Sequence, residues 1–436
     1  MRRISFFLSW LLLFVAGCDT GEVVTSPTIG NKYDPSKPRV ITEIMPLSGE
    51  IGEKFVVRGN FGPDLDNMKV LFAGQHEAVL ISTDGISIYG IVPKQPNGDN
   101  TVEVWVGDEQ ITTGTRFSYI QNQRVSTVSG KYNTSAYTDG NIFDARFQSL
   151  VAVGVVDGDN IIAVETHNQR IRLVSQTESK VTTLMTGFCT GKPAVNQARD
   201  KIYFVELYNN AHKVFVMEKE TGWVPRKIRE NISELNGGEL WSCALDKTEK
   251  YLYVRNQRGV FVRVYLEEYG SDGQLKVEVL LNILPTGNSN AFNMLVYSPV
   301  DDCFFASQMG AHGIYRIWQE ATTSEWQIEE YAGFIRAGAV DGDRKTEAQF
   351  NYPFGMTVDR EGNLYVAESY NYLIRKISRA TGMVTTVAGR YRATGGLDGL
   401  PLESTFNDPQ DIAVDSEDNF FIVEQGAKTI RKLAIE

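Results

Sequence analysis

The sequence is poor in the residues on which catalytic and metal centres most often depend. Only 4 histidines and 4 cysteines occur among 436 residues. No Ser–His–Asp order, HExxH motif or phosphate-binding loop surrounds the histidines, so the sequence predicts no catalytic residues. Cys189, Cys243 and Cys303 are widely spaced and odd in number, which argues against a disulfide framework and a zinc site. We expect these three to be small buried side chains, although one pair among them remains open as a disulfide.

Positive charge is also scarce. The chain has 43 Lys and Arg against 54 Asp and Glu, a formal net charge of −11, and its basic residues form no cluster. Because binding to nucleic-acid phosphates needs a basic face, the composition excludes a nucleic-acid partner. Neutral or cationic partners are expected.

The apolar run near the N-terminus is too short to cross a membrane. It extends from Ile4 to Val15, whereas a spanning helix needs roughly 20 residues. Two arginines precede it and the small residues of "VAGC" follow it. This pattern predicts an export signal over residues 1–17.

The cysteine in "VAGC" stands at the predicted cleavage point. The motif resembles the lipobox of bacterial lipoproteins, which implies that Cys18 is lipidated and holds the protein at a membrane. An ordinary secretory signal with a coincidental cysteine is the alternative. Residues 18–37 are rich in turn formers and predict a flexible tether. By resemblance to signals in some Gram-negative bacteria, the acidic Asp19 and Glu22 indicate an outer-membrane anchor that faces the cell exterior.

Residues 38–120 alternate short β-rich runs with turn residues. Examples are "KFVVRGNFG", "MKVLFAG" and "TVEVWVGD". Such runs of alternating faces predict a small antiparallel sandwich. The segment resembles the IPT/TIG family of immunoglobulin-like domains through the turn at Pro46–Gly49, Gly52, "RGNFG", Gly74 and the "VP" at residues 92–93. The resemblance implies a spacer or binding module.

From residue 123 to 436 the chain repeats a unit of two strands around a polar turn. The residue that ends the first strand marks each unit, at Glu165, Glu206, Arg255, Ser307, Glu368 and Glu424. The spacings between these markers leave room for a four-stranded sheet, so the unit is predicted to be a propeller blade.

The last two units are similar to the NHL-repeat family of β-propellers. They share a proline, an "xxVD" strand, an acidic strand end as in "NLYVAE" and an "IRKI"-like strand. The middle units depart from this pattern, because Arg255 and Ser307 take the acidic position. The chain stops after the third strand of the last unit, while "RVSTVSG" at residues 124–130 looks like a strand without a blade. We therefore expect an all-β protein in which this strand closes a six-bladed ring.

Three acidic turns carry carboxylates that could bind calcium. The turns "VDGDN", "VDGDR" and "VDD" carry Asp157, Asp159, Asp341, Asp343, Asp301 and Asp302. None completes the twelve-residue calcium loop with its distal glutamate, so turn chemistry is the preferred interpretation and no metal or other cofactor is predicted.

Loops at one face of the predicted ring carry aromatic and neutral polar residues. Two sets of positions are expected there: Lys192, Trp241, Asn293, Phe354 and Gln410 at the inner-strand starts, and His167, Tyr208, Gln308, Tyr370 and Tyr372 on the second turns. Aromatic rings beside hydrogen-bonding groups suit sugars. For each ring, simple packing of the propeller mouth is the alternative.

The sequence therefore predicts a lipid-anchored surface protein that binds extracellular glycan and works beside outer-membrane uptake proteins. This order of domains resembles surface proteins of Gram-negative glycan-uptake systems, an argument from fold-level analogy. Two alternatives stay open. One is a propeller enzyme of the lyase, lactonase or hydrolase type, and the other is a protein-interaction scaffold.

Overall fold

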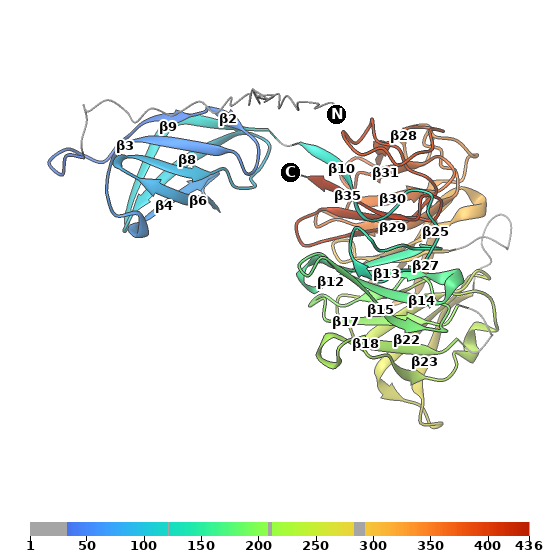
Figure 1. Cartoon of the computed structure of the whole chain (residues 1–436). Coiled ribbons are helices and arrows are strands. Elements are labelled where there is room, and N and C mark those ends of the chain that lie inside the picture. Colours follow the sequence, from blue (N-terminus) through green and yellow to red (C-terminus); the bar gives the residue numbers. More distant parts are fainter. Residues whose placement is uncertain (1–32, 121, 208–211, 283–292, 436) are drawn as a thin grey trace, which may run out of the picture. The chain divides into compact units, whose positions relative to one another are not determined.

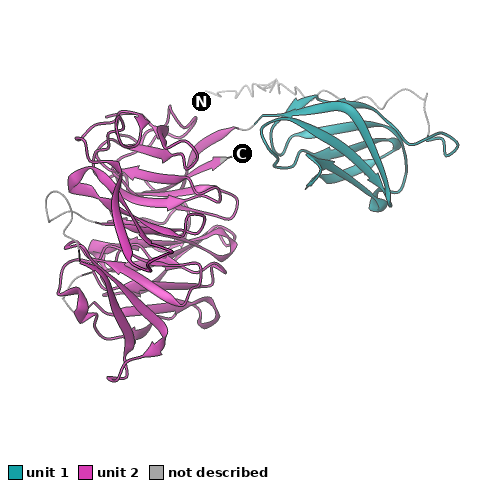
Figure 2. Ribbon diagram, turned by 180° about the vertical axis from the view of Figure 1, so that it is seen from behind, with its two compact units in different colours: residues 1–121 teal, residues 122–436 magenta. Residues whose placement is uncertain are grey.

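The computed structural model describes residues 33–120, 122–207, 212–282 and 293–435 (Figure 1). The expected signal peptide, Cys18 and the first part of the tether lie outside these residues, as does Tyr208. The chain divides into two compact units, residues 1–121 and 122–436 (Figure 2). No helix within the described ranges is long and apolar enough to span a membrane.

The first unit is a sandwich of two β-sheets, as the sequence predicted. One sheet has the order β1 (Ile41–Met45), β3 (Lys54–Gly62), β7 (Gly85–Ile91), β6 (Val79–Thr83). The other has the order β2 (Ser48–Gly49), β9 (Glu109–Tyr119), β8 (Gly98–Val106), β4 (Met68–Phe72), β5 (His76–Glu77), with the short 3-10 helix η1 (Leu65–Asn67) before β4.

Alternation along the strands builds the core of this unit. In β8, every second residue from Asn100 to Val106 is buried, because successive side chains of a strand point to opposite faces. Phe72 lies at the centre of the core and makes edge-to-face contacts with Phe55 and Phe117 at 5.2 and 5.1 Å between ring centroids.

The second unit consists of six antiparallel sheets, the blades of a six-bladed β-propeller. Blade 1 contains β12 (Ala152–Val156), β13 (Asn160–Glu165), β14 (Arg170–Ser175), β15 (Lys180–Thr186) and β11 (Gly140–Asn141). Blade 2 contains β16 (Ala194–Val195), β17 (Lys201–Val205), β18 (Val214–Glu218) and β19 (Arg226–Arg229). Blade 3 contains β20 (Cys243–Leu245), β21 (Tyr251–Arg255), β22 (Val260–Tyr269) and β23 (Leu275–Asn282). Blade 4 contains β24 (Leu295–Ser298), β25 (Cys303–Gln308), β26 (Gly313–Gln319) and β27 (Trp326–Gly333). Blade 5 contains β29 (Pro353–Val358), β30 (Leu364–Glu368), β31 (Leu373–Ile377), β32 (Met383–Gly389) and β28 (Gly342–Asp343). Blade 6 contains β33 (Pro409–Val414), β34 (Phe420–Glu424), β35 (Thr429–Ile435) and β10 (Gln123–Gly130).

The ring closes as the sequence predicted. Strand β10 pairs antiparallel with β35, from Gln123 opposite Ile435 to Gly130 opposite Thr429, and so completes blade 6 (Figure 1). Val125 of β10 is buried in the core between blades 5 and 6. Closure gives β35 a partner for backbone hydrogen bonds that would otherwise form an exposed sheet edge.

In the described part of the propeller, five further 3-10 turns connect strands. They are η2 (Asp157–Asp159), η3 (Thr166–Asn168), η4 (Lys219–Thr221), η5 (Ser233–Leu235) and η6 (Met309–Ala311). Two of them, η3 and η6, follow the second strand of their blades. They therefore lie at the propeller face where the inner strands begin, which we call the entry face.

Candidate functional site

Blades 1, 5 and 6 each hold a buried ion pair between their second and third strands. In blade 5, Arg375 Nη1 donates to Glu368 Oε2 at 3.0 Å, and both side chains are fully buried. The backbone N–H of Asn351 donates to the other carboxylate oxygen at 3.1 Å. Arg375 also pairs with the half-exposed Asp341 at 2.6 Å and lies over the ring of Phe350.

The same arrangement recurs in two other blades. Its members are Glu165, Arg172 and Asp139 in blade 1, and Glu424, Arg431 and Asp398 in blade 6. Burial raises the pKa of Glu424 and raises the pKa of Glu368 to about 7, although the paired arginine acts to lower the pKa in each case. Each guanidinium has two carboxylates within ion-pair distance, so the buried charges of these centres are compensated within their own blade.

The assignment of this acidic position in blades 3 and 4 was wrong by one residue. In blades 5 and 6 the acid faces the preceding blade, as does the apolar residue two positions before it. In blade 4, Phe304 and Ala306 pack against blade 3, so Gln308 takes the acidic position and Ser307 faces the other way. In blade 3, Leu252 and Val254 pack against blade 2. The position there belongs to Asn256, and Arg255 points toward blade 4. A shift of one residue along a strand exchanges its two faces, which explains the error.

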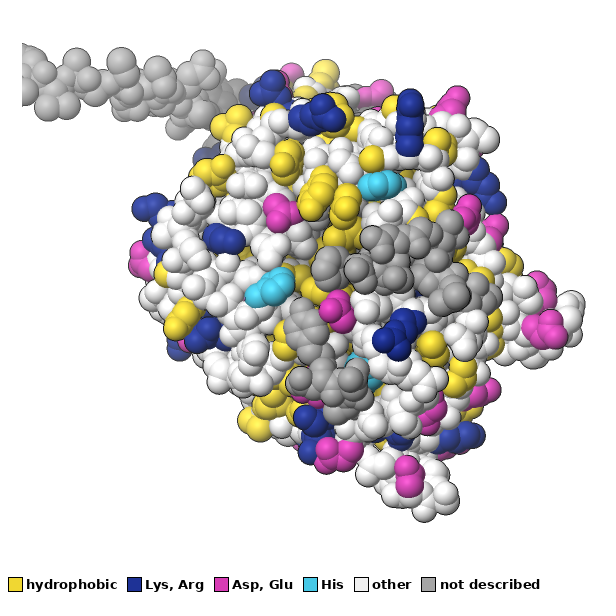
Figure 3. Space-filling model, turned by 90° about the vertical axis from the view of Figure 1, so that its right-hand side faces the viewer, with side chains coloured by type: hydrophobic (Ala, Val, Ile, Leu, Met, Phe, Trp, Pro, Cys, Tyr) yellow, Lys and Arg dark blue, Asp and Glu magenta, His cyan; other side chains and the backbone are white. Residues whose placement is uncertain are grey.

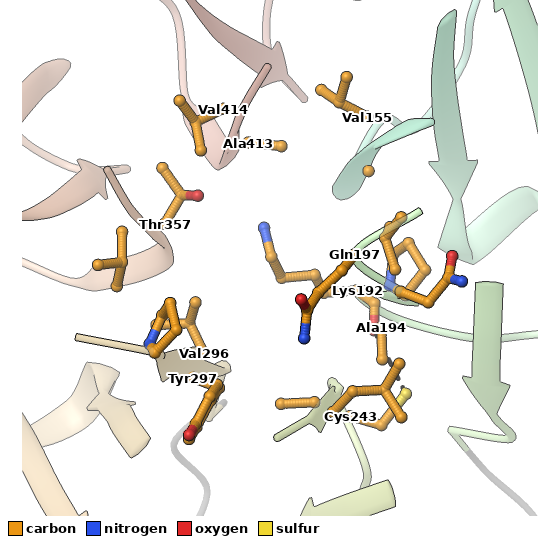
Figure 4. A pocket seen from close by; sticks show the side chains of 18 of the residues that line it. Val155, Lys192, Ala194, Gln197, Cys243, Val296, Tyr297, Thr357, Ala413 and Val414 are labelled. Carbon is orange, nitrogen blue, oxygen red and sulfur yellow. Dashed lines mark hydrogen bonds between the residues drawn. The ribbon is translucent and has the colours of Figure 1, made fainter. Parts of the chain in front are cut away.

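The inner strands of all six blades line a central channel with a cavity of about 670 Å³ (Figure 4). Its wall is formed mainly by small apolar side chains, including Val155, Ala194, Val296, Ala413 and Val414. At the opposite end from the entry face it carries charged residues such as Lys247 and Arg360, which pair with Asp302 and Asp418.

A buried ion pair crosses the channel. Lys192 Nζ donates to both carboxylate oxygens of Asp411, at 2.7 and 2.9 Å, and to the carbonyl oxygen of Ile412. The backbone N–H of Val153 donates to Asp411 Oδ2 at 2.9 Å. These bonds join blades 6, 1 and 2. A Cβ at Gly355 would lie 2.2 Å from Asp411 Oδ1, so blade 5 approaches the same carboxylate with its bare backbone. Lys192, a predicted ligand residue, is thus held by a partner that the sequence analysis missed.

Two of the aromatic residues that were predicted to bind a ligand are buried in the core. Trp241 and Phe354 are 2% and 1% exposed and contact each other edge to face at 5.8 Å. The indole N–H of Trp241 donates to Glu239 Oε2 at 3.0 Å. The expectation that Trp241 offers an open platform for a sugar is therefore wrong, because its ring packs with the neighbouring blades' apolar side chains. Partly buried Tyr372 also packs into the core, between blades 5 and 6.

Tyr370 does reach solvent at the entry face. Its side chain is 55% exposed and stacks on Tyr352, with ring centroids 4.1 Å apart and an angle of 25° between the planes. The ring of His312 meets Tyr352 edge to face, and the backbone N–H of Tyr352 donates to His312 Nδ1 at 3.3 Å. Burial lowers the pKa of His312. Figure 3 shows one face of the molecule, with a group of hydrophobic side chains in its upper half and a histidine next to this group.

A polar band continues from the tyrosine stack across blades 5, 6 and 1. Gln410 Nε2 donates to Ser369 Oγ at 3.2 Å, next to Tyr370. Gln425 Nε2 donates to Ser149 Oγ at 3.2 Å, and this hydroxyl lies 2.9 Å from Nδ1 of the exposed His167. Gln410 and His167 were both predicted from the sequence. Buried Asn293, also predicted, accepts a hydrogen bond from Arg255 Nη1 at 3.1 Å on the opposite side of the stack.

The acidic turns are engaged in ion pairs. Their partners are Lys219 for Asp157, Arg375 for Asp341, Arg379 for Asp301 and Lys247 for Asp302. In the part of the chain that the structure describes, no three His, Cys, Asp or Glu side chains gather as a metal site. Cys189, Cys243 and Cys303 are free thiols, and burial raises the pKa of Cys243 to about 12.

Comparison with known families defines the class of protein. The IPT/TIG domain family matches residues 39–119. NHL repeat-containing protein 2 of Bos taurus is 37% identical over 78 residues, which are 18% of this chain and 11% of that protein. The chain thus matches about a tenth of this relative's length. It joins an IPT/TIG domain to an NHL-type propeller.

Solved structures extend the similarity to nearly the whole chain. A Bacteroides thetaiotaomicron protein of unknown function is 33% identical with a TM-score of 0.75, over 93% of this chain and all of that chain. The chain belongs to the same family as that protein. An auxiliary nutrient binding protein from Bacteroides ovatus is 21% identical with a TM-score of 0.65, over 93% of this chain and all of that one, which shows a shared fold.

Proposed function

We propose that the chain is a lipid-anchored cell-surface protein that binds extracellular glycan at the entry face of its propeller. The observation that carries this proposal is the exposed stack of Tyr370 on Tyr352, with the polar band of blades 5, 6 and 1 beside it. A phenol ring held flat by a second ring offers an apolar platform to the C–H face of a sugar. In the band, Ser369, Gln410 and Ser149 are buried, while Gln425 and the exposed His167 reach the surface, where their amide and imidazole groups suit the sugar's hydroxyls.

The band favours an extended ligand. It runs from Ser369 through Gln410 and Asp408 to Gln425 and His167, and so passes three consecutive blades. A single sugar stacked on one ring binds weakly, whereas an oligosaccharide lying along the band gains from several contacts at once. Proteins of this fold from Bacteroides are described as auxiliary nutrient binding proteins, and glycan capture beside outer-membrane uptake proteins fits that description.

Cys18 supplies the anchor in this proposal, placing the propeller at the outer membrane on the cell exterior. We assign the channel pair of Lys192 and Asp411 to the ring's structure and propose that the protein binds its ligand without converting it. We expect the protein to bind its ligand at equilibrium and not to turn it over.

A glycan array probed with the full chain, followed by calorimetry with the polysaccharide it identifies, tests this function. Tyr370→Ala should weaken binding, whereas Tyr269→Ala, at an exposed tyrosine of blade 3 outside the entry face, should not. Equal binding by wild type and Tyr370→Ala would place the ligand elsewhere. Accumulation of shortened products would replace binding by a propeller enzyme, and capture of protein ligands alone would favour a scaffold.

A further inference from the structure

Blade 4 lacks both charged members of the repeated ion pair. In blade 5, Glu368 pairs across the strands with Leu373, and Arg375 follows Leu373 by two residues. In blade 4, Gln308 pairs with Gly313, and Tyr315 follows Gly313 by two residues. Gln308 therefore occupies the position of the buried glutamate, and Tyr315 occupies that of the arginine. A neutral amide and a phenol thus stand where blades 1, 5 and 6 hold opposite charges. The blade's own repeat supplies no charge at this centre.

An arginine of the neighbouring blade 3 places its guanidinium at the same centre. Arg255 ends β21 of blade 3, is 2% exposed and lies over the ring of Tyr315 at 5.5 Å. Its Nη1 donates to Asn293 Oδ1 at 3.1 Å. Asn293 directly precedes Met294, whose carbonyl accepts the N–H of Ser307 at 2.9 Å, so Asn293 and Gln308 lie at the same level of blade 4. Arg255, Asn293, Tyr315 and Gln308 therefore form one cluster, which we call the Arg255 cluster.

Two members of the Arg255 cluster have unused hydrogen-bonding capacity. Among the residues that the structure describes, Arg255 Nη2 and both amide atoms of the fully buried Gln308 have no hydrogen-bond partner. No carboxylate of the described ranges lies within ion-pair distance of Arg255, in contrast to Arg172, Arg375 and Arg431. A buried guanidinium without a counter-charge and a buried amide without partners are both unfavourable. They are expected where a ligand supplies the missing groups.

We propose that the Arg255 cluster binds the carboxylate of an acidic sugar. The guanidinium matches a carboxylate in charge and shape, and Gln308 Nε2 adds a second donor. Gln308 Oε1 accepts a hydrogen bond from a hydroxyl next to the carboxylate. A uronate carries both groups on one ring, whereas a phosphate dianion calls for more positive charge than one arginine supplies. The inference rests on the proposed function for its glycan class and adds that the glycan is acidic.

The position of the cluster agrees with this ligand. Arg255 and Gln308 each end the second strand of their blade, at the entry face, and His312 of the tyrosine stack follows Gln308 by four residues. The Arg255 cluster and the tyrosine stack therefore lie at the same face of the propeller, in adjoining blades.

The test measures the melting temperature of the full chain with sodium glucuronate, with glucose, and with sodium chloride at the same ionic strength. Glucuronate should raise the melting temperature and the other two should not. Gln308→Glu restores the acid of the other blades and pairs Arg255 internally. This variant should melt above wild type without ligand and lose the response to glucuronate. Gln319→Glu, at an exposed glutamine of the same blade, should keep the response.

Calorimetry with an oligouronate and a neutral oligosaccharide of equal length gives the second readout. Wild type should prefer the oligouronate by about tenfold or more, the scale of a hydrogen bond to a charged group, and Arg255→Met should remove the preference. Equal responses of wild type to glucuronate and glucose, or a full response in Gln308→Glu, would overturn the inference.

The outcomes also separate the two proposals. Neutral glycan binding that depends on Tyr370, without preference for uronates, would refute the Arg255 cluster as a ligand site and leave the proposed function intact. A glucuronate response that disappears in Gln308→Glu, together with an array that detects no glycan, would support the cluster and refute glycan capture.

Discussion

Lys192 Nζ lies 2.7 Å from Asp411 Oδ1, and this pair links blade 2 to blade 6 across the propeller channel. Both side chains are buried, and burial raises the pKa of Asp411 despite the neighbouring ammonium group. The β10–β35 pairing at the periphery of the ring and this pair near its axis both join segments that are far apart in the sequence.

Removal of the channel lysine should destabilise the propeller strongly. Lys192→Met leaves Asp411 as a buried carboxylate without a counter-charge, which is expected to lower the free energy of unfolding by about 3 to 5 kcal/mol. Urea denaturation followed by tryptophan fluorescence measures the change. The control is Lys201→Met, which breaks a partly exposed pair with Glu218 and should cost about 1 kcal/mol or less. Equal effects of the two variants would contradict the role of the channel pair.

Closure by β10 should depend on the buried face of that strand. Val125→Asp places a charge in the core between blades 5 and 6, and a loss of about 3 kcal/mol or more is expected. Arg124→Asp, at the exposed neighbouring position, should change the stability little. Thermal melting and size-exclusion chromatography compare the two. A monomeric Val125→Asp variant with an unchanged melting curve would show that the ring does not need this strand.

The tyrosine stack should lose ligand affinity at acidic pH. His312 Nδ1 accepts the N–H of Tyr352, which requires a neutral ring, and burial lowers the pKa of this histidine. In the unfolded chain the group titrates near 6.5. Its contribution to stability is therefore complete above about pH 6.5 and is lost as the pH falls through the lower pKa of the folded state. Calorimetry at pH 7.5 and 5.5 should show weaker binding at the lower pH.

A matched variant isolates this effect. His312→Asn keeps an acceptor and tolerates the left-handed backbone at this position, where φ is 56°. Its affinity should vary less with pH than that of wild type. An identical pH dependence in the two proteins would exclude His312 as the cause.

Stacking on Tyr370 should contribute measurably to affinity. Burying about 50 to 80 Å² of apolar surface on one ring contributes on the order of 1 to 2 kcal/mol, so Tyr370→Ala should weaken glycan binding by about five- to thirtyfold. Circular dichroism confirms that the variant is folded. Tyr269→Ala provides the matched loss of an exposed ring, and a similar loss in both would indicate non-specific adsorption.

Membrane attachment should depend on Cys18. Without its thiol no acyl chain can be added, so Cys18→Ala should appear in the soluble fraction after a carbonate wash, while wild type stays in the membrane fraction. A cysteine variant elsewhere, Cys189→Ala, should stay membrane-bound. A Cys18→Ala protein that remains with the membrane would place the anchor in another part of the chain.

The class of fold followed from the sequence because its determinants are local and repeated. Turn residues at short intervals and alternating β-rich runs predict strands, and six copies of one unit with a spare strand at the N-terminal side predict a closed ring. The acidic strand end of the NHL-like units was also visible, since Glu368 and Glu424 stand at equal places in two similar segments.

Only the tertiary structure decided which face each residue takes. A shift of one residue exchanges the two faces of a strand, and no local feature of blades 3 and 4 fixed the register, so Asn256 and Gln308 were missed and Arg255 was misplaced. Burial of Trp241 and the pairing of Lys192 with Asp411, 219 residues away along the chain, arise from contacts between different blades. Such contacts form only when the ring closes, because they join segments that carry no sequence signal for each other.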